Sequence, residues 1–325
     1  MRPPRALPPS LGAAAFTSTE LAAAGIPSDR VRARDVTRIA QGVYVPEGID
    51  ERSWSAAAAL ARTTGGVVSH LSAAQHHGIP VPARLQADTT LHLSFETRNR
   101  THRSELTTVT SHRRRLPRDL VVDVNGLPVT TPARTWCDLA SMLLPHEQPA
   151  LVAAADHLIT PPWTPQGRAK PLLTVGDLHS ALRQSGQFKG IRLARSALEL
   201  ARMGADSVPE TLMRLALMDA GLPEPELQLA IDPSDPRAPV GDAGYRVWLI
   251  LLQYDGAGHR SPEQQARDAY RDGYAQQRGW VTVRATVTDL RDGFRRVIGL
   301  VRSRAASFGG EAIPHRPSSF PSTRT

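Results

Sequence analysis

Cysteine is nearly absent from this chain, because Cys137 is the single cysteine in 325 residues. An intrachain disulfide is therefore excluded, and the cytoplasm is the expected location. Aromatic residues make up only 5% of the sequence, and no apolar run reaches the roughly 18 residues that a membrane span requires. The N-terminus also lacks the apolar core of a signal peptide, so we expect a frayed tail there and no membrane partner.

Positive charge is what the sequence has in excess. Lysine and arginine together number 39 against 31 aspartate and glutamate residues, which leaves a formal net charge of +8. Such a balance favours a polyanionic partner, chiefly nucleic acid. A GC-rich genome would raise arginine usage without any such role, so both interpretations stay open.

Length and changes in composition predict a multidomain chain of the α/β (α+β) class. The segment from Pro161 to Pro171 is rich in proline and polar residues, which is typical of a linker. We expect this order: a disordered tail over 1–10, a winged-helix-like domain over 11–50, a basic α+β middle domain over 51–160, a linker over 161–171, a helical connector over 172–205, an α/β domain over 206–307 and a disordered tail over 308–325.

The domain expected over 11–50 has the pattern of two short helices followed by a pair of strands. Thr17 and Glu20 have the spacing of a capping box, and Ser28 is suited to cap a second helix. The glycine-broken run over 39–45 predicts two short strands that would form a wing. Arginines on the second helix and its exit would contact DNA, and a solvated face on a structural domain is the alternative. These arginines are Arg30, Arg32 and Arg34.

The middle domain contains the densest basic segment of the chain. This segment surrounds and follows two expected strands, 91–95 and 106–110, which would form a hairpin. We expect its arginines to track a phosphate backbone, and a mobile charged loop is the alternative. His70, His76 and His77 lack the cysteine or carboxylate spacing of a metal site, so packing and capping explain them better. The arginines at the hairpin exit are Arg113, Arg114 and Arg115.

A continuous apolar run over 247–252 predicts a strand buried on both faces. Polar residues and a glycine turn follow it, so their side chains would lie at the edge of a hydrophobic sheet. Carboxylates, a histidine and a strand end are the parts of a metal-dependent site that cleaves phosphodiesters. Aspartates that simply form turns before glycine are the alternative. The candidate side chains are Glu210, Asp242, Gln253, Asp255 and His259.

Residues 207–302 resemble the endonuclease-like domain related to very-short-patch-repair endonucleases, within the PD-(D/E)XK nuclease superfamily. The resemblance implies a restriction-endonuclease-like mixed sheet flanked by helices. It rests on an ordered set of segments rather than on any one of them. These segments are SVPETLMRLAL from Ser207, AGLPEPELQ from Ala220, VGDAGY from Val240, LQYDGAGHR from Leu252, QARDAYR from Gln265 and GWVTVRAT from Gly279.

The resemblance also implies roles for the candidate side chains. Asp242 would be the shared ligand of a magnesium ion, and Asp255, at a position where many superfamily members have lysine, would be a second metal residue. Glu210 would support the metal through water. His259 would act as an acid or base. Gln253 stands where a glutamate is expected, and its neutral amide should weaken magnesium binding.

Arg271 belongs to the same segment set and has two expected roles. It lies three residues after Asp268, so the two side chains are spaced to pair on one helix face. Alternatively, Arg271 would hold a phosphate of bound DNA.

The upstream half resembles the antitoxins of abortive-infection type IV toxin–antitoxin systems, which implies DNA binding and a toxin encoded nearby. Two functions are therefore expected. One is a metal-dependent DNA endonuclease, catalytically weakened, in phage defence or DNA repair. The other is a non-enzymatic transcriptional regulator of antitoxin type. The segments that carry the likeness are GVYVP from Gly42, SHLSAAQHHG from Ser69 and TPARTWCDL from Thr131.

Overall fold

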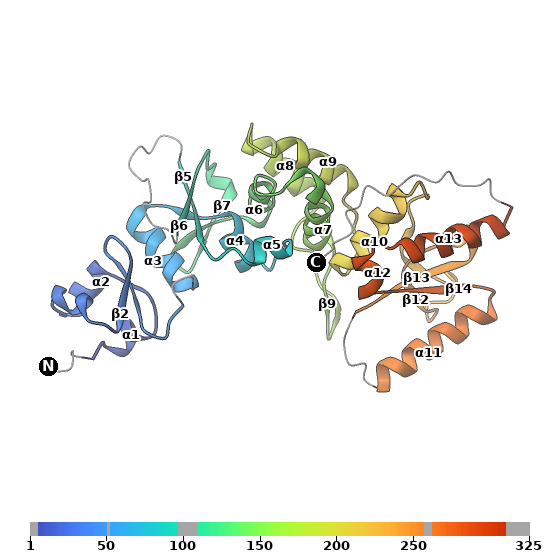
Figure 1. The fold of residues 1–325 in the computed structure, drawn as a ribbon, viewed down its shortest axis with the longest axis horizontal. Coiled ribbons are helices and arrows are strands. Elements are labelled where there is room, and N and C mark those ends of the chain that lie inside the picture. Colours follow the sequence, from blue (N-terminus) through green and yellow to red (C-terminus); the bar gives the residue numbers. More distant parts are fainter. Residues whose placement is uncertain (1–5, 51–52, 97–108, 257–261, 310–325) are drawn as a thin grey trace. The chain divides into compact units, whose positions relative to one another are not determined.

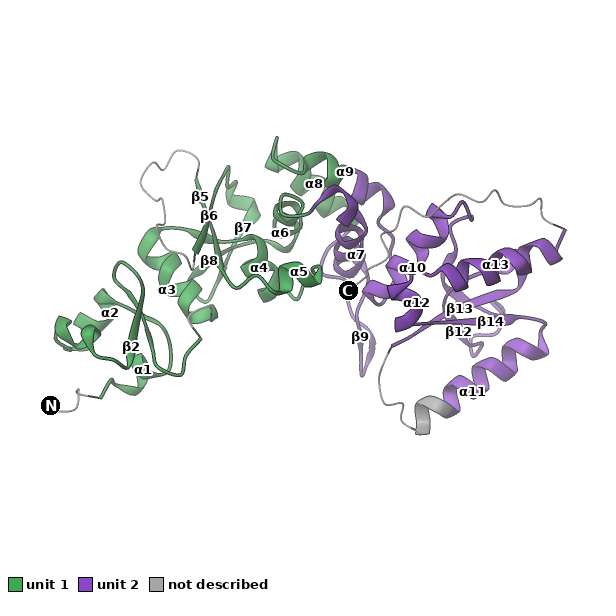
Figure 2. Cartoon of the chain, viewed as in Figure 1, with its two compact units in different colours: residues 1–143, 175–195 green, residues 144–174, 196–325 purple. Residues whose placement is uncertain are grey.

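The computed structural model describes residues 6–50, 53–96, 109–256 and 262–309 (Figure 1). The chain forms two compact units, each built from two separate stretches (Figure 2). Unit 1 comprises residues 1–143 and 175–195, and unit 2 comprises 144–174 and 196–325. Both are mixed α/β structures, as composition predicts. Residues 144–160 thus belong with the C-terminal unit, although the sequence led us to expect them in the middle domain.

The N-terminal part of unit 1 is a small three-stranded antiparallel sheet with short helices. The expected capping box is present, because Thr17 Oγ1 accepts a hydrogen bond from Glu20 N and Glu20 Oε2 accepts one from Thr17 N. The strand order is β1-β3-β2. The elements are α1 (Pro9–Gly12), β1 (Phe16–Thr17), α2 (Ser18–Ala23), η1 (Ser28–Arg32), β2 (Val36–Ala40) and β3 (Val43–Pro46).

The second helix expected from Ser28 is a single short 3₁₀ segment, η1, rather than an α-helix. Pro27 precedes it without a side-chain cap, and Ala33 is already extended. The chain needs this extended backbone to enter β2 only three residues later. A 3₁₀ run of this length is the form that such short connections take.

A five-stranded sheet of order β6-β5-β4-β8-β7 forms the centre of unit 1. Its strands β5 and β6 pair in parallel, from Leu91 beside Val109 to Glu96 beside Arg114. The expectation of a hairpin here is therefore wrong, because parallel neighbours need a crossover rather than a tight turn. The strands are β4 (Val67–Val68), β5 (Leu91–Glu96), β6 (Val109–Arg114), β7 (Val121–Val124) and β8 (Leu127–Thr130).

Alanine-rich α3 and the apolar faces of these strands share one core. Small side chains let the helix backbone approach the sheet closely. Ser53 caps α3 through Ala56 N, and Gly65 ends it in the left-handed region. The helices of unit 1 are α3 (Trp54–Thr64), α4 (His70–His76), α5 (Ala83–Gln86), η2 (Arg118–Leu120), α6 (Pro132–Leu139) and α8 (Val175–Ser185).

Unit 2 contains a four-stranded mixed sheet of order β11-β12-β13-β14, antiparallel except for the parallel pair β13 and β14. Ile250 and Leu252 point to the face covered by α10 and α13, whereas Leu251 packs with Trp280 and α11 on the other face. The strands are β11 (Glu226–Ala230), β12 (Val240–Tyr245), β13 (Ile250–Asp255) and β14 (Val281–Thr286).

The buried strand is shorter than the apolar run predicted. Val247 lies in a 3₁₀ turn, Leu249 has a left-handed backbone (φ 52°), and β13 begins at Ile250. This turn connects β12 to β13. The helical elements of unit 2 are η3 (Pro145–Glu147), α7 (Gln148–Ile159), α10 (Val208–Asp219), η4 (Arg246–Trp248), α11 (Pro262–Gln277), α12 (Val287–Arg291) and α13 (Arg295–Ser307), and α9 (Ile191–Leu200) spans the boundary between units.

The segment expected as a linker contains a small antiparallel hairpin, β9 (Trp163–Thr164) with β10 (Gly167–Arg168). Arg168 joins it to the rest of unit 2 by paired contacts with the carboxylate of Asp206. Composition alone missed this, because the ordering contacts come from a residue far along the chain. None of the helices in the described ranges has both the length and the apolar composition of a membrane span.

Candidate functional site

Neighbouring strands bring two of the predicted side chains together in unit 2. Ala243 on β12 pairs with Leu252 on β13, so one step further along this antiparallel register Asp242 faces Gln253. Both side chains belong to the α11 face of the sheet, since strand residues alternate. Asp242 Oδ2 also accepts a hydrogen bond from the backbone N of Tyr254 at 2.7 Å. The strand pair therefore holds the carboxylate in a fixed position.

Glu210 reaches the same region from the first turn of α10. Its Oε1 accepts a hydrogen bond from Ser207 Oγ at 2.7 Å, and its Oε2 accepts one from Asp206 N at 2.8 Å. Burial and the nearby negative charge of Asp242 raise the pKa of Glu210 to about 7. Burial likewise raises the pKa of Asp242. The structure thus brings two desolvated carboxylates within electrostatic reach of each other.

Arg271 on α11 contacts the side chain of Gln253. Its Nη1 donates to Gln253 Oε1, and its Nη2 donates to Asp268 Oδ1 at 2.9 Å. Burial raises the pKa of Asp242, and the positive charge of Arg271 partly offsets this effect by lowering the same pKa. The expected pairing of Asp268 with Arg271 is therefore present, and the same guanidinium also engages the amide. Gln253 Nε2 is buried without a hydrogen-bond partner.

Asp255 ends β13, two residues beyond Gln253, and therefore belongs to the same face of the sheet. Its parallel neighbour on β14 is Thr286. His259 lies outside the described residues.

The contacts of these residues do not favour a resident magnesium ion. Hydrogen bonds already engage both oxygens of Glu210, one oxygen of Asp242 and the amide oxygen of Gln253. Across the described ranges, no group of three or more His, Cys, Asp or Glu side chains is arranged to hold a metal ion. Magnesium prefers oxygen ligands in near-octahedral geometry, whereas this site directs a guanidinium at the amide.

The arginines expected at the first DNA-contacting surface divide into two kinds. Arg30 is 7% exposed, and its Nη1 and Nη2 donate to the two oxygens of Asp35 at 2.9 and 2.6 Å. This bond holds the pKa of Asp35 below its usual value. Arg30 is therefore a structural residue, and the expectation that it contacts DNA is wrong. Arg32 and Arg34 are exposed.

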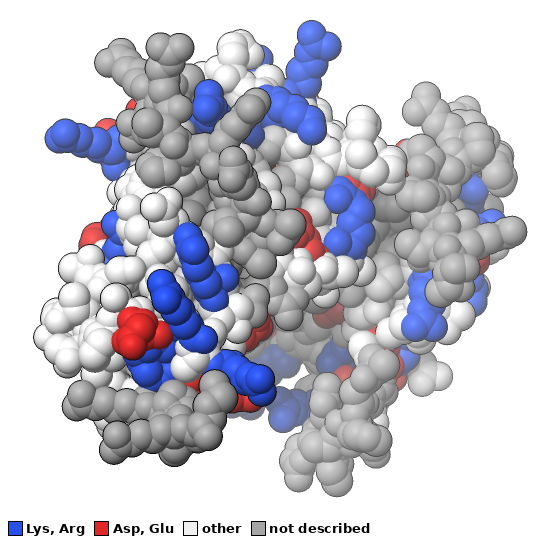
Figure 3. Space-filling view, turned by 60° about the vertical axis from the view of Figure 1, so that its left-hand side comes forward, with Lys and Arg blue, Asp and Glu red and all other residues white. Residues whose placement is uncertain are grey.

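Strand alternation separates the three consecutive arginines at the end of β6. Arg113 and Arg115 are exposed, whereas the side chain of Arg114 is only 13% exposed. Arg114 turns inward, over the ring of Phe188 and 4.0 Å from Asp138. Its expected role as a phosphate contact is therefore wrong, because one strand cannot present adjacent side chains to one face. Lys and Arg side chains project from the face that Figure 3 brings forward.

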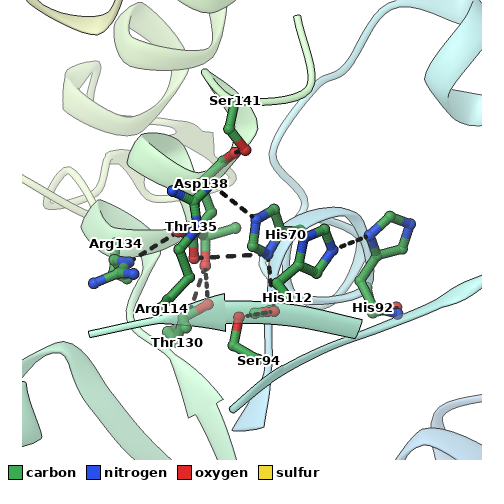
Figure 4. Close-up of polar contacts among 12 residues, drawn as sticks. His70, His92, Ser94, His112, Arg114, Thr130, Arg134, Thr135, Asp138 and Ser141 are labelled. Atoms are coloured by element: carbon green, nitrogen blue, oxygen red, sulfur yellow. Dashed lines mark hydrogen bonds and ion pairs between the residues drawn. The ribbon is translucent and has the colours of Figure 1, made fainter. Parts of the chain in front are cut away.

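A buried histidine cluster in unit 1 is a polar feature that the sequence analysis did not predict (Figure 4). The rings of His70 and His112 stack with centroids 3.4 Å apart, and His112 Nε2 lies 2.9 Å from His92 Nδ1. Burial lowers the pKa of all three histidines, and that of His112 falls to about 3. Burial therefore favours the neutral form of all three rings.

Two buried charged side chains of α6 border the cluster. Arg134 Nε donates to Asp138 Oδ1 at 2.9 Å, and Asp138 Oδ2 lies 4.0 Å from His70 Nδ1. His70 itself adopts a left-handed backbone (φ 50°), which is uncommon outside glycine. One sequence signal existed: His92 alternates with the apolar residues of a strand that is buried on both faces. The expectation that His70 serves packing agrees with this placement.

Comparisons with known proteins name no function. No family model matches the chain. Two uncharacterized proteins of Mycobacterium tuberculosis, MT2308 and Rv2248, are each 27% identical over 169 residues, which is 52% of this chain. The chain spans 58% of the length of these relatives. The crystal structure of the RV2827C protein from the same species is similar over 58% of this chain and 74% of its own, with 18% identity and a TM-score of 0.38.

Proposed function

We propose that this chain is a DNA-binding regulator of antitoxin type, whose C-terminal domain has a nuclease-like sheet but no hydrolytic metal site. One observation carries the proposal: Arg271 donates to Gln253 at the position where a metal-binding glutamate is expected. The guanidinium supplies, as a fixed group, the positive charge that a cation would supply in a nuclease. The sheet then serves as a scaffold.

DNA binding in this proposal comes from exposed arginines of unit 1. Arg32 ends the 3₁₀ turn of the winged-helix-like part and Arg34 follows it. Arg113 lies in β6 and Arg115 just after it, at the edge of the five-stranded sheet. Exposed guanidinium groups bind phosphate and release counterions, which makes the affinity depend steeply on salt. A net charge of +8 supports the same partner.

Two measurements on the purified full chain test the proposal. We expect binding to a duplex promoter fragment that weakens as salt rises, and no nicking of supercoiled plasmid in magnesium or manganese. Gln253→Glu should remain inactive, because Arg271 would pair with the new carboxylate. Nicking by the natural chain that Asp242→Ala abolishes would overturn the proposal.

A weakened metal-dependent endonuclease is the second candidate. It is favoured by the raised pKa of Glu210, because a bound cation would relieve the repulsion between this carboxylate and Asp242. The double variant Gln253→Glu with Arg271→Ala tests it. Magnesium binding by calorimetry together with plasmid nicking would support a degraded nuclease centre, and neither signal in this variant would eliminate it.

A further inference from the structure

An exposed tryptophan lies at the open end of the small hairpin β9–β10, where it pairs with Arg168. Trp163 on β9 is 65% exposed. The chain's other tryptophans, at 54, 136, 248 and 280, are all buried or half-buried. Single exposed apolar side chains are ordinary, but polar contacts hold this ring in place.

Polar contacts hold this ring without covering it. Trp163 Nε1 donates to Asp206 Oδ2 at 3.0 Å, and the guanidinium of Arg168 lies over the ring, 4.2 Å from its centroid. Arg168 also donates to Asp206 and, through Nη2, to Gln228 Oε1 at 3.1 Å. The indole edge and one ring face are therefore engaged, while most of the side chain stays in solvent.

The same contacts connect the ring to the candidate site. Asp206, which accepts from Trp163, donates its backbone N to Glu210 Oε2, and its charge raises the pKa of both Glu210 and Asp242. Trp163 is thus two hydrogen-bonded steps from Glu210. All of these residues belong to unit 2.

Positive charge beside a flat exposed ring favours a nucleic acid over an apolar partner surface. Arg168 neutralises Asp206, and Lys170 follows as an exposed cation at the base of the hairpin. A flat ring backed by a guanidinium, beside a lysine, has the components of a base-stacking platform with phosphate contacts. Because the ring is already ordered, stacking would cost little further side-chain entropy.

We infer that Trp163 is a stacking platform for an unstacked nucleobase of DNA, positioned at the rim of the Glu210 and Asp242 site. The inference rests on the proposed DNA-binding function and deepens it. Arg168 and Asp206 are positioning residues that fix the ring, and Lys170 contacts phosphate. The platform accepts any base, since every base has a π-face.

Tryptophan fluorescence of the full chain provides a test that needs no variant. The probes are an oligothymidine of about 12 nucleotides, within the footprint of small single-strand sites, and an abasic strand of equal length. Oligothymidine should protect the exposed indole from acrylamide quenching, and the abasic strand should not. Affinity for oligothymidine should exceed that for the abasic strand.

Variants provide the second measurement. Trp163→Ala should weaken oligothymidine binding roughly 5- to 150-fold, the effect of losing one stacked base. Trp163→Phe should retain most of the affinity, and Leu172→Ala, at a residue 55% exposed just beyond the hairpin, should change nothing. Circular dichroism verifies that each variant folds.

The outcomes separate the inference from the function on which it rests. Salt-sensitive duplex binding with equal affinity for both strands and no fluorescence protection would overturn the role of Trp163 alone. No binding to any of these DNAs at low salt would overturn both. Protection by an unrelated acidic protein, with none by oligothymidine, would assign the ring to a protein partner instead.

Discussion

At the scale of single residues, neighbouring groups determine what each ionisable side chain does. Glu210 and Asp242 are ordinary acidic residues in the sequence, yet burial raises the pKa of each in the folded chain. Arg30 and Arg114 are ordinary basic residues that turn inward. Perturbed groups of this kind cluster at functional sites, although structural networks produce them too.

The pKa of Glu210 provides a direct test of the carboxylate pair. A carbon-detected NMR titration of the natural chain should give a midpoint near the value of about 7. Asp242→Asn removes the second cause of the shift, so the midpoint should fall toward 4.5 while burial keeps it above that value. An unchanged midpoint in this variant would show that the two carboxylates do not interact.

The histidine cluster makes the stability of unit 1 depend on pH. Each cluster histidine has a folded pKa below its usual 6.5, so the unfolded chain binds protons first as the pH falls. Stability from this source is present above about pH 6.5 and is lost as the pH falls toward the pKa of His112, about 3. Asp88, whose folded pKa is also lowered, adds to the loss at the acid end.

Thermal unfolding between pH 7.5 and 5 measures this effect, within the range where histidine titrates. His112→Gln should reduce the fall in melting temperature, because the variant has one buried histidine fewer. His179→Gln, at an exposed position on α8, should leave the fall unchanged. Equal slopes for His112→Gln and the natural chain would remove the cluster as the cause.

At the scale of elements, one buried ion pair joins α7 to α10 across 58 residues of sequence. Arg214 Nη2 donates to Asp156 Oδ2 at 2.9 Å, and both side chains are at most 1% exposed. Thr211 and the backbone of Arg202 also donate to Asp156. Removing one partner would leave the other charge buried and unpaired, which is far more costly than losing a surface pair.

Urea denaturation should therefore distinguish a buried arginine from an exposed one. Arg214→Ala should lower the free energy of unfolding by about 3–5 kcal/mol. Arg295→Ala, in an exposed pair with Asp292, should lower it by less than about 1 kcal/mol. Similar losses for the two variants would contradict a structural role for the α7 to α10 pair.

At the scale of the whole molecule, some arginines form buried ion pairs and others lie exposed on the surface. Some guanidinium groups are buried in ion pairs, as those of Arg30 and Arg214 are, whereas Arg113 and Arg115 remain exposed. The number of arginines alone therefore overstates the surface available to a polyanion. Only the exposed groups contribute to counterion release.

The salt dependence of DNA binding should reveal this division. Arg113→Gln with Arg115→Gln should reduce the slope of log affinity against log salt by about 2, or one per lost phosphate contact. The exposed Arg295→Gln on α13 is the matched control and should leave the slope unchanged. An equal decrease in both variants would mean that binding follows net charge rather than the β6 surface.

The sequence alone predicted those features that depend on neighbours along the chain. The capping box of Thr17 and Glu20 and the spacing of Asp268 and Arg271 both proved correct. The same holds for the mixed α/β class. Each depends on groups within about one helical turn, where covalent geometry limits the choices.

Tertiary structure alone decided the features that depend on distant partners. Asp206 converts a proline-rich segment into an ordered hairpin, and parallel pairing of β5 with β6 brings His92 beside His112. The resemblance led us to expect a carboxylate at the position of Gln253, but only the packing of α11 on the sheet directs Arg271 at this side chain. The physical reason is that burial and charge proximity arise when segments meet, and neither is a property of composition.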